Sequence, residues 1–154
     1  MRTFSATLTA LALAALGALV PATGAQAATP CDNAWNSAPP GYLYLYGSTN
    51  CNGLLARAGA DDPDWDDTSG PVRGLDTGDV GSLLQKGTTG MAVKLYEGPG
   101  HTGDHVCLTR SEPYVSETSE LTFPDGRPVN SIRSHQWVSA SECAARDRPN
   151  RRKQ

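Results

Sequence analysis

After residue 27 the sequence contains no apolar run of the ~20 residues that a membrane-spanning helix needs, which argues against a transmembrane protein. The one apolar run, residues 8–20, is too short to span a bilayer and follows the positively charged Arg2. The Ala-Gln-Ala triplet at 25–27 has the small-x-small pattern of a cleavage site. We therefore expect residues 1–27 to be a signal peptide and the rest of the chain to be secreted, with no membrane span.

Catalytic motifs are also missing. The sequence has no Gly-x-Ser-x-Gly elbow, no His-Glu-x-x-His motif and no phosphate-binding glycine loop. We therefore expect no catalytic residues and no enzyme activity. A pair of carboxylates, as in a glycosidase, is the enzymatic alternative that the sequence leaves open.

Basic residues are scarce in the body of the chain. Residues 28–143 hold 7 Lys and Arg against 15 Asp and Glu, whereas 144–154 holds five basic residues and one acidic residue. An acidic body disfavours a nucleic-acid partner, because phosphates require a basic face. We expect 144–154 to be a flexible, solvated basic tail, with contact to an anionic surface as the alternative.

Four cysteines follow the expected signal peptide: Cys31, Cys51, Cys107 and Cys143. An even number of cysteines in a small exported protein indicates two disulfides. No Cys-x-x-Cys pair is present, so zinc is not expected. Four cysteines allow three pairings, and their number alone does not choose among them.

The remaining pattern is that of an all-β protein with long connections. Residues 28–40 are rich in Pro, Ala and Asn and predict a coil that leads into the fold, and 60–79 predicts a long loop. No sustained helical period follows the signal peptide; the short helical candidates are 83–86 and 139–145. Strands are expected at 42–46, 91–96, 105–109 and 131–138, the last with a buried Trp137.

The two halves of the chain repeat each other. When the sequence is shifted by 50 residues, Tyr46 falls on Tyr96 and Gly53 on Gly103. Each Tyr ends an apolar strand, and each Gly follows seven positions later, where it can adopt φ > 0 as the chain folds back. A later Ser in each half can tie this hairpin down through a hydroxyl hydrogen bond to the backbone.

These residues resemble the βγ-crystallin Greek-key motif, which has an aromatic residue, a variable hairpin, a Gly and a later Ser. With the export signal and the cysteines, the chain resembles the secreted bacterial peptidase-inhibitor family of that fold, of which the actinomycete metalloproteinase inhibitor is the known type. The resemblance covers roughly 41–138 and is carried by Gly-Tyr-Leu-Tyr-Leu-Tyr at 41–46, Leu-Tyr-Glu-Gly at 95–98 and 129–137. The second hairpin aromatic of the motif is replaced by Cys51 and His101.

The resemblance implies a disulfide-stapled, βγ-crystallin-like β-sandwich of two Greek-key motifs. The domain would span 41–143, with one repeat at about 41–89 and the other at about 90–138. It implies a protein that inhibits an extracellular protease through a rigid loop, and we expect this protein to be a monomer. The alternative is a non-enzymatic binding or structural module of crystallin type, with calcium as its one possible cofactor.

The repeat favours one disulfide in each half, Cys31–Cys51 and Cys107–Cys143. The alternative, Cys31–Cys143 with Cys51–Cys107, would instead tie the two halves together. For the inhibitory bond, the resemblance to inhibitors of thermolysin-type proteases, which favour an apolar residue after the scissile bond, suggests Cys107–Leu108, beside a cystine.

Calcium has two candidate places. Crystallin-type sites resemble a pair of Asn or Asp, two spacers and a hydroxyl pair, which suggests Asp79, Ser82, Asn130 and Ser134 as ligands. Arg133 stands where a ligand hydroxyl belongs, and its positive charge would repel the ion. The acidic loop at 61–67 has alternating Asp residues, but it lacks the Gly and Glu that an EF-hand loop requires. We expect turn-stabilising roles for these side chains, with calcium as the alternative.

Overall fold

The computed structural model describes residues 29–75, 79–129 and 131–143. The expected signal peptide (1–27) and basic tail (144–154) lie outside the described residues, so both stay predictions. In the described part of the chain, no helix is long and apolar enough to cross a membrane.

Within the described residues, seven strands and four short helical segments make up the fold. In chain order they are α1 (Pro30–Ser37), β1 (Tyr42–Ser48), β2 (Asn52–Ala58), β3 (Ser82–Lys86), β4 (Met91–Gly98), η1 (Pro99–His101), β5 (Thr102–Leu108), β6 (Tyr114–Val115), η2 (Thr118–Glu120), β7 (Ser134–Ser139) and η3 (Ala140–Glu142). All four strands expected from the sequence are present, with shifted ends.

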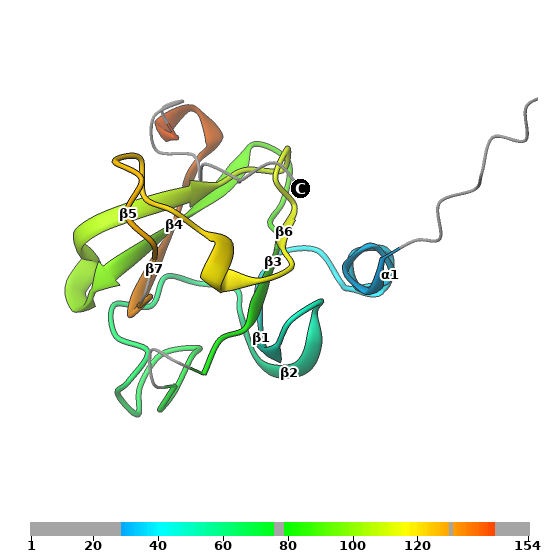
Figure 1. Ribbon diagram of the computed structural model, residues 1–154, viewed down its shortest axis with the longest axis horizontal. Helices are drawn as coiled ribbons and strands as arrows, with labels where there is room; N and C mark the ends of the chain where they lie inside the picture. Colours follow the sequence, from blue (N-terminus) through cyan, green and yellow to red (C-terminus); the bar gives the residue numbers. More distant parts are fainter. Residues whose placement is uncertain (1–28, 76–78, 130, 144–154) are drawn as a thin grey trace, which may run out of the picture.

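The strands form two antiparallel sheets that face each other (Figure 1). One sheet has the order β2-β1-β3-β6 and the other the order β5-β4-β7. β6 comes from the second half of the chain but pairs with β3 of the first half, joining Leu83 to Val115. In return, Asp62 of the first half forms an antiparallel bridge with His135 in β7. Each half therefore gives its third strand segment to the other sheet, which makes two interlocked Greek-key motifs.

One main core fills the space between the sheets. Leu43 and Leu45 of β1 point into it together with Val93 and Leu95 of β4, and all four side chains are almost fully buried. The repeat thus places the same β1 and β4 positions at the centre of the sandwich. The largest fully buried side chain, Trp65, comes from the loop between β2 and β3.

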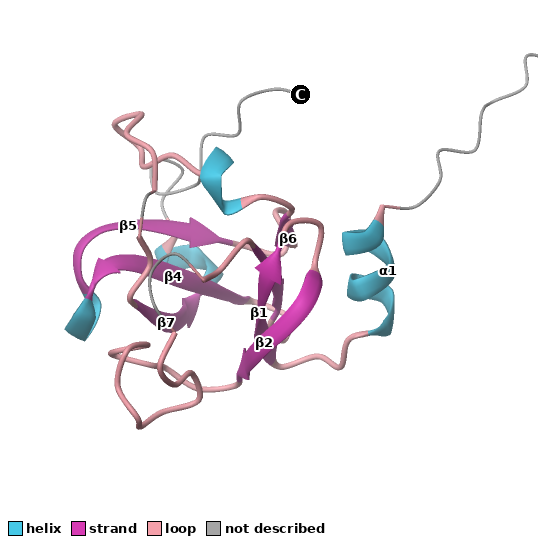
Figure 2. Ribbon diagram, turned by 60° about the horizontal axis from the view of Figure 1, so that its bottom comes forward, coloured by secondary structure: helices cyan, strands magenta, loops and turns pink. Residues whose placement is uncertain are grey.

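Both faces of β1 are covered, which explains its unbroken run of strand formers. Tyr44 and Tyr46 face away from the main core and pack with Leu84 against Trp35 of α1. Figure 2 shows α1 outside the sheet that contains β1. A strand buried on both faces does not show apolar and polar alternation.

The predicted lead-in coil at 28–40 is wrong, because Pro30–Ser37 forms α1. Thr29 caps this helix: its hydroxyl accepts from the Asp32 N–H, and the Asp32 carboxylate accepts from the Thr29 N–H. Pro30 suits the first helical turn, where its missing N–H has no partner to lose. The Tyr114 hydroxyl also donates to Asp32, and this bond is the main cause that lowers the pKa of that carboxyl.

Three smaller expectations fail in whole or in part. Residues 83–86 lie in β3 rather than in a helix, because the central β1 strand pairs with them from Tyr42 to Tyr46. Trp137 is half-buried at the margin of the core rather than fully buried. Of the helix expected at 139–145, the described residues 139–143 show the single turn of η3.

Each half of the chain carries its own disulfide. The structure joins Cys31 to Cys51 and Cys107 to Cys143, with Cα atoms 5.0 and 5.8 Å apart. These are the two local pairs that the repeat favours. The first attaches α1 to the hairpin between β1 and β2, and the second attaches the end of β7 and η3 to β5.

Candidate functional site

The two hairpins have the same conformation and the same hydroxyl tie. Cys51 and His101 both have φ near +60°, and Gly53 and Gly103 have φ of +70° and +78°. In the first hairpin, Ser82 donates to the Ser48 carbonyl at 2.6 Å and accepts from the Cys51 N–H at 2.9 Å.

In the second hairpin, Ser134 donates to the Gly98 carbonyl at 2.6 Å and accepts from the His101 N–H at 3.2 Å. Ser82 lies opposite Tyr46, and Ser134 lies opposite Tyr96, so the two ties share one register. The serines thus fix the hairpin backbones, in the way the repeat suggested.

The substituted aromatic positions remain part of this packing. His101 lies against the Tyr96 ring with the ring centroids 5.4 Å apart, and His105 lies 5.2 Å from the same ring. Cys51 packs instead with Tyr46 and bonds to Cys31. The spacing of His101 and His105 also occurs in zinc sites, but within 29–75, 79–129 and 131–143 no three His, Cys, Asp or Glu side chains gather as metal ligands.

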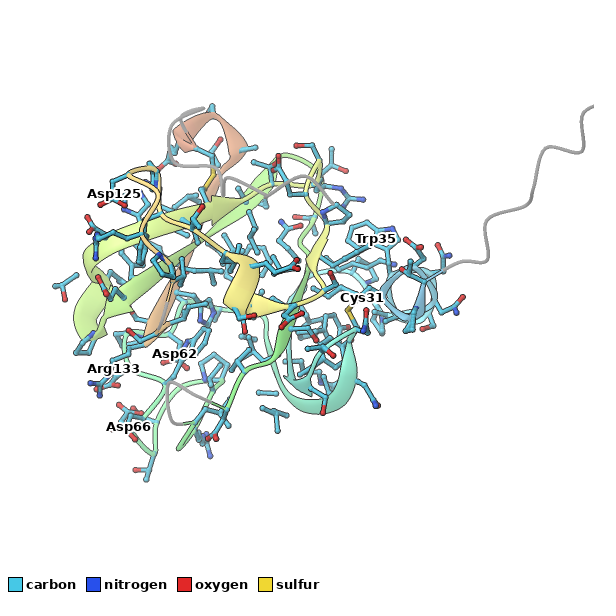
Figure 3. The ribbon with its side chains drawn as sticks, viewed as in Figure 1. Cys31, Trp35, Asp62, Asp66, Asp125 and Arg133 are labelled. Atoms are coloured by element: carbon cyan, nitrogen blue, oxygen red, sulfur yellow. A yellow bond between two sulfur atoms is a disulfide. The ribbon has the colours of Figure 1, made fainter. Side chains whose placement is uncertain are left out.

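The calcium candidates occupy structural roles where the structure describes them. Both serine hydroxyls are engaged with the hairpin backbones, and Asp79 is exposed. Asn130 lies outside the described residues. The guanidinium of Arg133, beside the crystallin-type candidate residues, pairs with Asp66 of the acidic loop at 3.3 Å (Figure 3).

The acidic loop at 61–67 is organised by its own carboxylates. The buried Asp62 accepts from the Asp64 N–H at 3.1 Å and from the Val72 N–H at 2.8 Å, and burial raises its pKa. Asp64 accepts from the Asp66 N–H, and Asp67 accepts from the Ser69 N–H and hydroxyl. These side chains stabilise turns, as Asx residues do in loops.

A buried histidine fastens this loop to the second sheet. Trp65 donates its indole N–H to His135 Nδ1 at 2.8 Å, and His135 Nε2 lies 2.9 Å from the Ala60 carbonyl. The imidazole therefore carries its proton on Nε2 and is neutral. Burial lowers the pKa of His135 to about 4.

The suggested inhibitory bond is not accessible. Cys107 and Leu108 lie at the end of β5, and both side chains are fully buried. Leu108 belongs to the main core and Cys107 to the disulfide. A protease would have to pull both residues out of the fold, so the structure argues against Cys107–Leu108 as a reactive bond.

The structure offers a different surface at β2. Leu54 and Leu55 are the large apolar side chains that stand out on the described surface, with exposed fractions of 56% and 44%. β2 is an edge strand, and Leu55 is the extra residue of a bulge, because Leu45 pairs with Ala56 while Tyr46 pairs with Leu54. A bulge tilts an edge strand and turns side chains out of the sheet.

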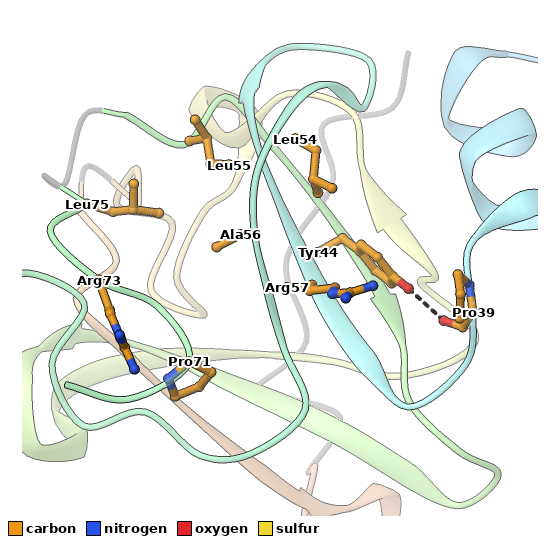
Figure 4. Close-up of a pocket in the computed structure, with 9 residues that line it drawn as sticks. All are labelled: Pro39, Tyr44, Leu54, Leu55, Ala56, Arg57, Pro71, Arg73 and Leu75. Carbon is orange, nitrogen blue, oxygen red and sulfur yellow. Dashed lines mark hydrogen bonds between the residues drawn. The ribbon is translucent and has the colours of Figure 1, made fainter. Parts of the chain in front are cut away.

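These leucines line an open groove, the β2 groove, with a volume of about 610 Å³ (Figure 4). Residues 54–57 of β2 run along it. Its two sides are formed by Pro39 and Tyr44, and by Pro71, Arg73 and Leu75. The Tyr44 hydroxyl donates to the Pro39 carbonyl at 2.8 Å, which fixes one side. The volume lies in the range of ligand sites, about 300–1,000 Å³.

Sequence reasoning missed this groove. The visible signal was the pair Leu54-Leu55 after Gly53, because two adjacent apolar residues in a strand cannot both face one core. That pair alone does not reveal an edge, since a strand buried on both faces shows the same pattern. Only the strand order leaves it exposed.

Comparisons with solved structures find βγ-crystallin domains at low identity. A structure described as concerning the evolution of the eye-lens βγ-crystallin domain fold is 16% identical, with a TM-score of 0.47, and the match covers 66% of this chain and 89% of that chain. The N-terminal domain of Protein S is 16% identical, with a TM-score of 0.42 and coverage of 64% and 97%. A βγ-crystallin domain from Flavobacterium johnsoniae is 16% identical, with a TM-score of 0.42, and the match covers 64% of this chain and 94% of that chain.

No protein-family model and no curated protein matches the chain. The exchanged strands and the two Tyr–Gly–Ser hairpins of the structure themselves define a βγ-crystallin-like sandwich. The resemblance to the peptidase-inhibitor family stays a prediction.

Proposed function

We propose that this protein is a secreted, non-enzymatic binding protein that inhibits a peptidase, and that it holds the peptidase through the β2 groove. The observation that supports the proposal is the pair of exposed leucines, Leu54 and Leu55, on an edge strand. Edge strands present unpaired backbone N–H and C=O groups, to which a partner's extended segment can add as a further strand.

The groove is held rigidly before any partner arrives. The Cys31–Cys51 disulfide lies immediately before β2, and the Ser82 hydroxyl fixes the hairpin from the other side. The Asn50 N–H also donates to the Ser116 carbonyl at 2.7 Å. A pre-ordered surface loses little conformational entropy on binding, which favours tight complexes.

Docking of a peptidase on the β2 edge strand differs from inhibition by a loop that binds like a substrate. The hairpin tip before β2 has φ of +59° at Asn50 and +55° at Cys51, whereas a peptide in a protease cleft is extended. The tip therefore does not have the shape of a substrate, and the extended residues 54–57 do. We expect the peptidase to be blocked by docking on β2, without cleavage of a bond in the inhibitor.

The test is inhibition by the chain that starts at residue 28, assayed against a thermolysin-type metalloprotease, a subtilisin-type protease and a trypsin-type protease. We expect one of the three to be inhibited at micromolar protein, with the inhibitor intact afterwards by mass spectrometry. The double variant Leu54→Asp/Leu55→Asp should lose this inhibition, and Thr88→Asp, at an exposed turn outside the groove, should keep it.

The expected loss can be estimated from burial. Full burial of a leucine side chain contributes about 1.5–3 kcal/mol, and roughly half of each leucine is exposed, so single Leu→Ala changes should weaken binding about 3–10-fold. Inhibition of none of the three proteases at micromolar concentration would refute the inhibitor function.

A further inference from the structure

We infer that the β2 groove takes an extended segment of another protein in which a carboxylate side chain lies among apolar ones. This inference rests on the proposed function, since it names the chemistry of the segment that the same groove binds. Three features carry it: the charge along the groove, its shape, and the poor fit of the alternative occupants.

The groove is basic in a chain whose body is acidic. Arg57 and Arg73 both line it, and among the described residues no Asp or Glu does. Residues 28–143 hold only 7 basic residues against 15 acidic ones, so two arginines in one groove make the groove locally positive in an otherwise acidic body. Arginine binds carboxylates with paired, charge-assisted hydrogen bonds.

Neither arginine is committed to an acidic partner within the described residues. The Arg57 guanidinium lies 5.5 Å from the centre of the Tyr42 ring, and no carboxylate of the described residues is within ion-pair distance of it. Arg73 donates its Nε–H to the Gly70 carbonyl at 3.0 Å. The acidic group that it influences is Asp67, whose pKa is lowered first by Ser69 and only weakly by Arg73.

The shape of the groove selects an extended chain. Residues 54–57 span ~10 Å of an edge strand at ~3.3 Å per residue, so the groove matches three or four residues of a partner strand. Successive side chains of an added strand point to opposite faces. The bulge puts Leu54 on the same face as Arg57, opposite Tyr46 and Tyr44, and Leu55 on the other face. An apolar residue can therefore cover Leu55 while its neighbour presents a carboxylate to Arg57.

Occupants from this chain itself fit poorly. The basic segment 144–154 has the same sign as the two arginines, so they repel it. The acidic loop of a second copy has the right sign, but its carboxylates are engaged in turns and Asp62 is buried. Pairing β2 with β2 of a second copy would leave the arginines of both copies without an acidic partner.

The probe is a fluorescein-labelled decapeptide of alternating Val and Glu, compared with alternating Val and Lys and titrated by fluorescence anisotropy. We expect the Glu peptide to bind at least tenfold more tightly than the Lys peptide, with the difference shrinking as salt screens the charges. The variant Arg57→Glu/Arg73→Glu should reverse the preference. The matched control Arg110→Glu, an exposed arginine outside the groove, should leave it unchanged.

A backbone-methylated Glu peptide separates strand addition from simple charge attraction. Methylation removes alternate N–H donors, so affinity should fall at least tenfold while net charge stays the same. Equal affinity for the Glu and Lys peptides, or no binding of the Glu peptide at 1 mM, would overturn the inference. Concentration-dependent dimerisation lost in Leu54→Asp/Leu55→Asp would also overturn it, because a second copy would then fill the groove.

The two proposals fail in different ways. If the Glu peptide binds with the expected charge reversal but no peptidase is inhibited, the inhibitor function is wrong and the peptide site stands. If a peptidase is inhibited through Leu54 and Leu55 but Arg57→Glu/Arg73→Glu inhibits equally well, the acidic-segment inference is wrong and the inhibitor function stands.

Discussion

Acidification should destabilise this protein through one buried side chain, His135. Its ring lies between the Trp65 indole and the Ala60 carbonyl, so a second ring proton has no acceptor and meets the Trp65 N–H instead. Burial lowers its pKa to about 4, and of the neighbouring charges Asp61 raises it slightly while His101 lowers it further. In the unfolded chain the imidazole titrates near its ordinary value, 6.5.

The direction in which the unfolding free energy changes with pH follows from proton uptake. Because the folded state binds this proton less tightly, the unfolded state takes it up first as the pH falls. The stabilisation is complete above pH 6.5 and is lost progressively down to about pH 4, below which both states are protonated. The gap between the two pKa values corresponds to a loss of about 3 kcal/mol. That is a large share of a typical unfolding free energy of about 5–15 kcal/mol.

The assay is urea unfolding at pH 7.5, 6, 5 and 4, followed by tryptophan fluorescence. The control is His135→Gln, whose amide can accept from Trp65 and donate to Ala60 without titrating. Asp62 acts in the opposite direction, because its raised pKa favours the folded state as pH falls, and the control retains that effect. The wild type should lose about 3 kcal/mol more than His135→Gln between pH 7.5 and 4. Equal losses, or a His135 pKa near 6.5 by NMR, would refute the reasoning.

Three further predictions concern the loops. Gly70→Ala should lower the unfolding free energy, measured in urea, by about 2–4 kcal/mol, because a Cβ at φ +75° would lie 2.6 Å from Asp62 Oδ2. The control Gly74→Ala, with open space at φ +61°, should lose about 1 kcal/mol, and equal losses in the two variants would contradict the predicted clash. Ser82→Ala and Ser134→Ala should each lose about 1–3 kcal/mol, because a backbone N–H loses its partner; unchanged melting would count against the ties. Millimolar calcium should leave Tm unchanged relative to chelator, whereas a bound ion at 100 times its Kd would add about 2.7 kcal/mol.

The local features of the fold were predictable from the sequence because their causes are local. The strand at 42–46 consists of strand formers between glycines, and the spacing of Tyr46 and Gly53 recurs at Tyr96 and Gly103. Hairpins of one sequence pattern adopt one conformation, and the structure shows matching φ values in both. The serine ties were predictable for the same reason.

The exchange of strands between the two sheets was not predictable in this way. β6 has only two residues, and Asp62 is a single bridge residue in a loop of turn formers, so neither shows a strand pattern. Their pairing depends on contacts between distant parts of the chain. Because that exchange also places His135 beside Trp65, the buried pair could not be inferred from either residue.

The helix and the groove were missed for opposite reasons. α1 had a readable signal in Thr29 and Asp32, but its Pro, Ala and Asn content resembles a loop. The β2 groove had a weak signal in Leu54-Leu55, and its exposure depends on β2 being the edge of its sheet. Edge position is a property of strand order, which no local pattern encodes.

Hydrogen exchange of the protein, alone and in complex with the peptidase it inhibits, tests the central claim most directly. If the peptidase docks in the β2 groove, it should slow the exchange of backbone amide hydrogens in residues 54–57 and in the facing loop at 71–75. Residues 104–108 of β5, which include the rejected bond, should exchange at unchanged rates. Protection of β5 or of the hairpin at 97–102, with none in β2, would contradict the account.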